Sequence, residues 1–376
     1  MATTGRTAEP TDADAASVLS SATFVRVTAA PTGGSLAAAA MLATACAERD
    51  VPYQVRVSRT PASDGPDATH VAIGFEASTT KSTDGAFDAD AVLGSDAPNT
   101  AFETARELGG SPDPVLAFAG ALADGVEPSS AVRDAANVER RPGVGIPTAD
   151  LATGLAHSTR VVASFSGDEQ AAGATLAELD LPAELDESAR RRLASAVALD
   201  AVDDATAGTP GKATEHAADA VSAVLRPHVT SDGPFETAEG YADVLAALAW
   251  DAPGLGTAFA LGNLGRSAAL DAWRDHAVAA HRAVRSADLS RHRGVVTARV
   301  EDAQPTVARL LRDYRSPESA ALVVGDRIAA LATTDANARD VLGSADESPG
   351  GAGTRTLAVT EYDDEDALVS GVREAL

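Results

Sequence analysis

The 376-residue chain has one cysteine, two lysines and few aromatic residues. A single cysteine, Cys46, excludes an internal disulfide and any zinc site built from several cysteines. No apolar run approaches the roughly 20 residues that a membrane-spanning helix needs, and the polar N-terminus lacks the apolar core of a signal peptide. We therefore expect a cytoplasmic protein without a membrane segment, whose residues 1–15 are disordered.

Basic residues are scarce too, since 30 Lys and Arg oppose 55 Asp and Glu, which gives a net charge of −25. A globular protein with this charge repels itself in dilute salt, whereas about 1 M salt screens charges beyond roughly 3 Å. Disorder does not explain the acidity, because 45% of the residues are hydrophobic and they fall in periodic segments. Only Lys81 and Lys212 are lysines, and we interpret the composition as that of an acidic, halophilic proteome.

The hydrophobic pattern predicts an α/β domain over residues 16–140. Apolar runs typical of buried strands alternate with Ala-rich helical segments, which favours a parallel sheet covered on both faces. The strands are expected at 23–30, 53–58 and 69–75, and helices at 35–50, 99–109 and 113–124.

A Pro/Gly break at 141–147 begins a mostly helical connector, which ends at a second break near residue 235. The remaining residues, 236–376, are predicted to form a smaller α+β domain. It opens with helices, continues in a strand–helix–strand–strand pattern from residue 295, and closes with a strand at 356–362 and a helix at 364–376.

The loop Pro31–Gly34 follows the first predicted strand and precedes a helix. Ligands of parallel sheets bind at the carboxyl ends of strands, and the backbone N–H groups of a helix N-terminus attract anions. Gly33 and Gly34 are therefore candidates for binding phosphate. The alternative is a tight turn whose glycines serve geometry alone.

The run FVRVTAAPTGGSLAAAAMLATACAERDVPYQVRVS resembles the opening of the DHH phosphoesterases, and especially archaeal RecJ-like proteins. The resemblance implies a parallel-sheet DHH domain, a connector and a smaller DHH-associated domain. In that family two aspartates of the first loop bind manganese or magnesium. The matching positions here hold Ala30 and Thr32, neither of which supplies an anionic oxygen.

The other metal motifs of that family are altered too. Its Asp after the third strand is matched only by Glu76, and the chain has no His-His pair at all. The run Gly120–Asp124 resembles the fourth motif, so Asp124 is the one surviving motif carboxylate, unless it is merely a helix-terminal Asp. Because a two-metal centre needs several carboxylates, we assign no metal site and no cofactor.

The resemblance extends to the C-terminal segment, where the family has a Gly-rich loop with a histidine. Here Gly350, Gly351 and Arg355 remain, but Ala352 lies near the histidine position. Such a loop can hold a phosphate through its N–H groups, or it can be a simple turn.

A locally basic stretch lies at residues 266–315, with ten Arg against six acids. Arg309 and Arg312 fall three residues apart on a predicted helix and are candidates for phosphate contacts. Pairing with nearby acids is the alternative.

The resemblance and its altered motifs predict a RecJ/DHH-like protein that is catalytically inactive and binds single-stranded DNA or RNA, or a replication or repair protein. One alternative is a weak exonuclease specific for single strands, which would need Mn or Mg and relocated carboxylates. Its candidate carboxylates are Glu76, Asp84, Asp88, Asp90 and Asp124. The other alternative is a protein-interaction scaffold without nucleic acid.

Overall fold

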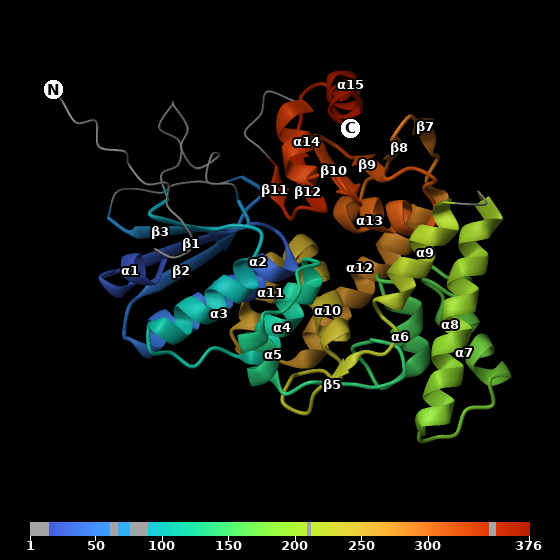
Figure 1. Ribbon diagram of the computed structural model, residues 1–376, viewed down its shortest axis with the longest axis horizontal. Helices are drawn as coiled ribbons and strands as arrows, with labels where there is room; N and C mark the ends of the chain where they lie inside the picture. Colours follow the sequence, from blue (N-terminus) through green and yellow to red (C-terminus); the bar gives the residue numbers. More distant parts are fainter. Residues whose placement is uncertain (1–14, 61–66, 76–88, 209–211, 346–350) are drawn as a thin grey trace.

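A computed structural model describes residues 15–60, 67–75, 89–208, 212–345 and 351–376. The chain builds two main sheets with helices packed between and around them (Figure 1). The prediction of disorder for residues 1–15 falls outside the described part, apart from Ala15, which begins α1 (Ala15–Ser20).

The first sheet is parallel and has the strand order β2-β1-β3-β4. Its central strand β1 pairs with β2 on one side and β3 on the other, so that Val25 lies opposite both Tyr53 and Thr69. The strands are β1 (Val25–Ala29), β2 (Tyr53–Val57), β3 (Thr69–Ile73) and β4 (Ala91–Leu93). The predicted parallel sheet is confirmed, while β4 is too short to show a sequence pattern.

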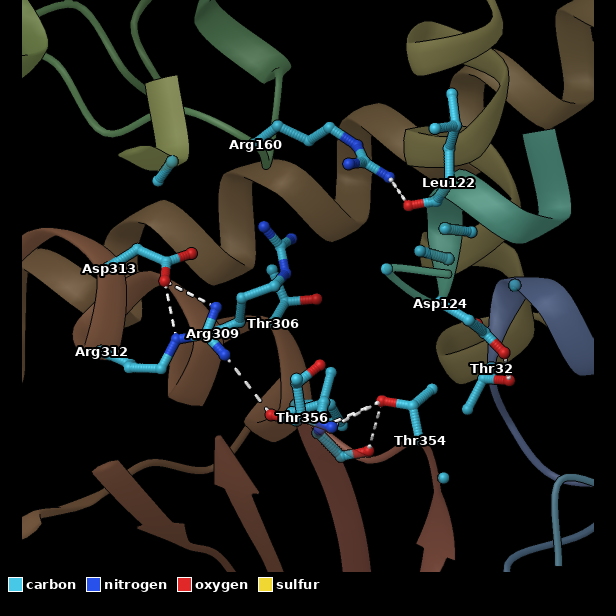
Figure 2. Close-up of a pocket in the computed structure, with 18 of the residues that line it drawn as sticks. Thr32, Leu122, Asp124, Arg160, Thr306, Arg309, Arg312, Asp313, Thr354 and Thr356 are labelled. Atoms are coloured by element: carbon cyan, nitrogen blue, oxygen red, sulfur yellow. Dashed lines mark hydrogen bonds and ion pairs between the residues drawn. The ribbon is translucent and has the colours of Figure 1, made fainter. Parts of the chain in front are cut away.

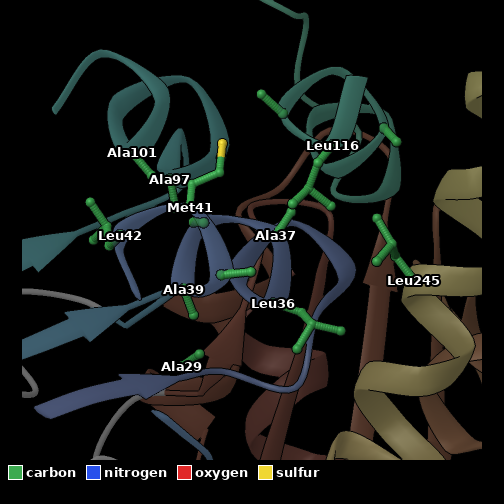
Figure 3. Packing of buried hydrophobic residues seen from close by; sticks show 14 of the residues in the cluster. Ala29, Leu36, Ala37, Ala39, Met41, Leu42, Ala97, Ala101, Leu116 and Leu245 are labelled. Carbon is green, nitrogen blue, oxygen red and sulfur yellow. The ribbon is translucent and has the colours of Figure 1, made fainter. Parts of the chain in front are cut away.

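Helix α2 (Gly33–Glu48) forms the centre of the first core, with 13 of its 16 residues buried. Its alanines allow several helices to approach closely, as Figure 3 shows for Ala37 and Leu116. A Cβ added at Gly120 would lie 2.6 Å from Ala37 Cβ, so this crossing requires a glycine. The helices packed around α2 are α3 (Ala97–Glu107), α4 (Pro114–Ala123), α10 (Ala238–Asp251) and α11 (Pro253–Ala260).

The predicted connector is largely helical, as expected. Its helices are α6 (Leu151–His157), α7 (Glu169–Glu178), α8 (Glu187–Gly208) and α9 (Lys212–Ser222), and α5 (Ser130–Ala136) precedes it. Two short strands, β5 (Glu139–Arg140) and β6 (His228–Val229), pair antiparallel and bring its two ends together.

The second sheet has six strands in the order β11-β12-β10-β9-β8-β7. Among the described strand pairs of this second sheet, β8 and β9 run parallel and the other pairs run antiparallel. The strands are β7 (Ser290–His292), β8 (Val295–Arg299), β9 (Ala320–Val324), β10 (Ile328–Thr333), β11 (Ala352–Gly353) and β12 (Leu357–Glu361). This mixed sheet with its helices confirms the predicted α+β character of the C-terminal part.

Alternating side chains give the second sheet two buried faces. Ala321 and Val323 of β9 join the core that contains α13 (Gln304–Tyr314). Leu322, between them, joins a separate core on the other face. That face is covered by α14 (Ala338–Ala345) and α15 (Glu365–Ala375).

Helices α10 and α12 (Arg266–Ser286) connect the two halves. Buried residues of α10, such as Leu245, share the core of α2, whereas Val284 near the end of α12 belongs to the core of the second sheet. The domain boundaries drawn at residues 140 and 235 remain predictions. None of the helices in the described ranges is long and apolar enough to cross a membrane.

Candidate functional site

A cavity of about 420 Å³ lies where β1 ends and where α4, α9, α10, α13 and the β11–β12 hairpin meet. Three arginines, Arg160, Arg309 and Arg312, line it together with several threonines. Trp250 and small apolar residues form further parts of the wall. Acidic side chains and a histidine line it too: Asp124, Asp219, Asp243, Asp313 and His216. The volume lies in the range of ligand pockets, which combine apolar walls with a few polar groups. Figure 2 shows Asp124 and Thr32 across the cavity from Arg309 and Arg312.

On one side, the first loop and the end of α4 form a junction of hydrogen bonds. Thr32 caps α2, and its hydroxyl lies 2.9 Å from Asp124 Oδ2. The Gly34 N–H donates to Asp124 Oδ1 at 2.8 Å. Both carboxylate oxygens of Asp124 are thus used within the chain, and the carboxylate stabilises the positive end of the α2 dipole.

Two glycines permit this close approach. A Cβ at Gly34 would lie 2.4 Å from Asp124 Oδ2, and one at Gly33 would lie 2.6 Å from Ala123 Cβ. The Gly34 N–H that was expected to hold a phosphate already donates to Asp124.

Burial raises the pKa of the Asp124 carboxyl to about 6. The hydrogen bonds from Gly34 and Thr32, and the charges of Arg339 and Arg160, oppose this rise. Desolvation therefore outweighs the groups that favour the ionised form.

The junction does not fit the metal centre that the resemblance implies. Ala30 stands where the resemblance implies the first metal-binding aspartate, but it is buried and offers only a methyl group. The Thr32 hydroxyl donates a hydrogen bond to the Asp124 carboxylate. Among the residues that the structure describes, no three His, Cys, Asp or Glu side chains gather in a way that could hold a metal ion.

On the other side, α13 supplies two arginines. Arg312 forms an ion pair with Asp313 at 2.6 Å and donates to the Thr333 carbonyl at 2.8 Å. Arg309 donates to the carbonyl of Thr159 at 3.1 Å. Burial, together with the like charge of Arg160, lowers the pKa of Arg309, although a guanidinium keeps its proton.

Arg160 brings a third guanidinium from the segment after α6. One of its nitrogens donates to the Leu122 carbonyl at 3.0 Å, and its own carbonyl accepts from the Tyr314 hydroxyl at 2.9 Å. No sequence signal pointed to Arg160, because a single arginine after a helix has no pattern.

The structure separates the predicted site residues. Asp124, Gly33, Arg309 and Arg312 line the cavity. Gly351 instead lines a smaller pocket beside β12, of about 180 Å³, and Arg355 is exposed, with a weak bond to the Asp335 carbonyl.

Of the proposed relocated carboxylates, the structure describes Asp90 and Asp124. Asp90 accepts a hydrogen bond from the His70 N–H at 2.8 Å and does not line the cavity. The remaining candidates that lie outside the described residues are Glu76, Asp84, Asp88 and Gly350.

Comparisons with known proteins identify the family of this chain. A family model described as "Uncharacterized protein rrnAC1427, C-terminal domain" matches residues 287–374. The uncharacterized protein rrnAC1427 of Haloarcula marismortui is 45% identical over 393 residues, which cover 100% of both chains. The chain belongs to the rrnAC1427 family.

Solved structures resemble this rrnAC1427-family protein at low sequence identity. RecJ of Thermus thermophilus in complex with Mn²⁺ is 14% identical with a TM-score of 0.43, over 96% of this chain and 54% of RecJ. CDC45 of Entamoeba histolytica is 8% identical with a TM-score of 0.49, over 94% of this chain and 95% of CDC45. This chain therefore spans about half the length of that RecJ.

The region matched by the rrnAC1427 C-terminal model includes α13. Arg309 and Arg312 thus come from the matched region, whereas Arg160 and Asp124 come from earlier parts of the chain. Residues of the matched region and residues from earlier in the chain therefore line the same cavity.

Proposed function

We propose that this protein binds single-stranded nucleic acid through its phosphates in the cavity, and that it does not cut the strand by a two-metal mechanism. The observation that carries the proposal is the convergence of Arg160, Arg309 and Arg312 on one cavity. Guanidinium groups bind phosphate oxygens through paired N–H donors, and such charge-assisted hydrogen bonds are strong.

The charge state of these arginines favours an anionic ligand. Arg312 is neutralised by Asp313, and both side chains are only 12–13% exposed. Within the described part of the chain, neither Arg160 nor Arg309 forms an ion pair with a carboxylate. Burial lowers the pKa of Arg309 even though the Asp313 and Asp243 carboxylates nearby oppose this, and a phosphate in the cavity would reduce the cost of burying the charge.

The hydrogen bonds of Asp124 support the proposal that the protein has no two-metal reaction. Thr32 and Gly34 hold the Asp124 carboxylate by hydrogen bonds at the place where the related proteins need metal ligands. Moving Asp124 to a metal would break both bonds and leave the N-terminus of α2 without its carboxylate. We accordingly expect no dependence of strand binding on Mn or Mg.

The test is the binding of a fluorescently labelled single strand, measured by anisotropy over a series of KCl concentrations with a chelator present. Replacing Arg309 by Ala should weaken binding about equally for all sequences and reduce the salt slope by about one. Arg315→Ala is the matched control, because Arg315 directly follows α13 as its C-cap but donates to the Val284 carbonyl and does not line the cavity. No binding by the wild type in low salt, or equal losses in both variants, would overturn the proposal.

A further inference from the structure

A buried histidine connects the cavity to a carboxylate. His276 of α12 lies with Nδ1 2.6 Å from Asp251 Oδ2, at the end of α10. Its Nε2 lies 2.9 Å from Thr306 Oγ1, in the first turn of α13. The His276 side chain is 0% exposed, and Thr306 lines the cavity. Three helices therefore bring a carboxylate, an imidazole and a hydroxyl into one chain of hydrogen bonds.

The carboxylate fixes the direction of these bonds. An ionised carboxylate only accepts, so when His276 carries a single proton, that proton resides on Nδ1. Nε2 then carries a lone pair and can only accept, so the Thr306 hydroxyl donates to it. A hydroxyl that donates to an imidazole, which is oriented in turn by a carboxylate, is the arrangement of an activated nucleophile.

The surroundings of Thr306 indicate what such a nucleophile would meet. Arg309 follows Thr306 by three residues on α13 and therefore lies on the same face of the helix. Figure 2 shows Thr306 beside Arg309, and Arg160 also lines the cavity. An anion held by these guanidinium groups would lie near the hydroxyl.

We propose that Thr306 is the nucleophile of a metal-independent phosphoester reaction, with His276 as its general base and Asp251 as the positioning residue. The inference rests on the proposed function, since the arginines that bind the phosphate would present it to Thr306. It goes beyond that function because it assigns chemistry to residues outside the altered metal motifs.

The reaction balances with water as the only co-reactant. Thr306 Oγ attacks phosphorus and gives its proton to His276 Nε2, while the bond between phosphorus and the leaving oxygen breaks. His276 passes that proton to the leaving oxygen, and an alcohol departs. The adduct on Thr306 is a phosphodiester that still carries the other part of the strand. Water then attacks its phosphorus and gives a proton to His276. The bond between Thr306 Oγ and phosphorus breaks, the strand leaves as a phosphate monoester, and Thr306 recovers the proton.

The experiment is covalent labelling with an alkyl fluorophosphonate in the presence of a chelator, followed by peptide mass spectrometry of the full-length protein. Thr306 should form the bond to phosphorus as fluoride leaves. Thr306→Val should abolish the adduct, and Thr306→Ser should retain it. His276→Gln should slow labelling by about 10²–10⁴-fold, the usual contribution of a general base.

Thr334→Val is the matched control. Thr334 also lines the cavity, but its hydroxyl bonds to the Ser319 carbonyl and to Asp335 instead of a histidine. This variant should label like the wild type. If the hydrogen bonds between Asp251, His276 and Thr306 serve only to hold the helices together, no adduct should form on Thr306.

The outcomes separate the two proposals. An unlabelled Thr306 in a protein that still binds single strands overturns this inference alone. A label on another residue that persists in Thr306→Val overturns it as well. Failure of the wild type to bind strands overturns the proposed function, as measured in the separate anisotropy experiment.

Discussion

The two walls of the cavity differ in how their buried polar groups are paired. On the wall of α2 and α4, the Asp124 carboxylate is matched by Thr32 and Gly34, so the polar groups satisfy one another. On the wall of α13, Arg309 donates to neutral oxygens of Thr159. Burial and the like charge of Arg160 lower its pKa, while Asp313 and Asp243 oppose this without forming an ion pair with it. The first wall is complete without a ligand, whereas the second is improved by an anion.

This difference assigns separate roles to the two walls. Changes on the Asp124 wall should alter stability and leave strand binding by the folded protein intact. Changes at Arg309 should do the reverse. The comparison would fail if both walls affected both properties alike.

The largest expected effect on stability is that of Gly34→Ala. The new Cβ would lie 2.4 Å from Asp124 Oδ2 and 2.9 Å from the Gly120 carbonyl oxygen, so the junction must move. Overpacking of this kind lowers the free energy of unfolding by about 3 kcal/mol. Urea unfolding measures the change.

Gly254→Ala is the control for that substitution. Gly254 lies in α11, and a Cβ there meets nothing within 4 Å. Alanine in a helix is favoured over glycine by about 0.5–1 kcal/mol, so this variant should be slightly more stable. Equal stability of the two variants would contradict the close junction at Gly34.

A second prediction concerns pH and Asp124→Asn. The pKa of Asp124 is raised by burial from 3.8 to about 6. The folded state therefore holds this proton more tightly than the unfolded state. The resulting stabilisation is fully present below about pH 3.8, and it is lost as the pH rises through about 6.

The variant lacks this titration, so its free energy of unfolding should rise relative to the wild type between about pH 4 and pH 7. The difference in pKa corresponds to at most about 3 kcal/mol. Because many carboxylates titrate in the same range, the quantity to follow is the difference between variant and wild type in urea unfolding at each pH. A difference that stays constant over this range would show that Asp124 is not desolvated in the folded state.

Much of the fold was predictable because burial leaves a pattern in the sequence. The strand β1 carries apolar residues at alternating positions, the helix α2 is rich in alanine, and both were expected close to where they lie. The three-residue strand β4 and the helix α14 were missed, since short or mixed segments carry too little periodicity.

The site was predictable only in part, because it depends on contacts between distant residues. The helical spacing indicated Arg309 and Arg312, and a short motif indicated Asp124. The partners of Arg309 and Asp124 were hidden, since Thr159 lies 150 residues from Arg309 and Gly34 lies 90 residues from Asp124. Arg312 instead pairs with the adjacent Asp313, which agrees with the alternative of pairing with nearby acids. For the same reason, the position of His276 between Asp251 and Thr306 could not be read from the sequence.

The smallest expected effect is that of Arg355→Ala, which tests whether the C-terminal glycine loop takes part in binding. Arg355 is exposed, makes only a 3.4 Å bond to the Asp335 carbonyl and does not line the cavity. Its removal should change the free energy of unfolding by less than about 0.5 kcal/mol, as for most surface substitutions. Strand affinity, measured by anisotropy beside Arg309→Ala, should stay at the wild-type value.

If Arg355→Ala instead weakened binding as much as Arg309→Ala, the strand would extend along the loop beyond the cavity. The division into one self-satisfied wall and one anion-binding wall would then be too simple.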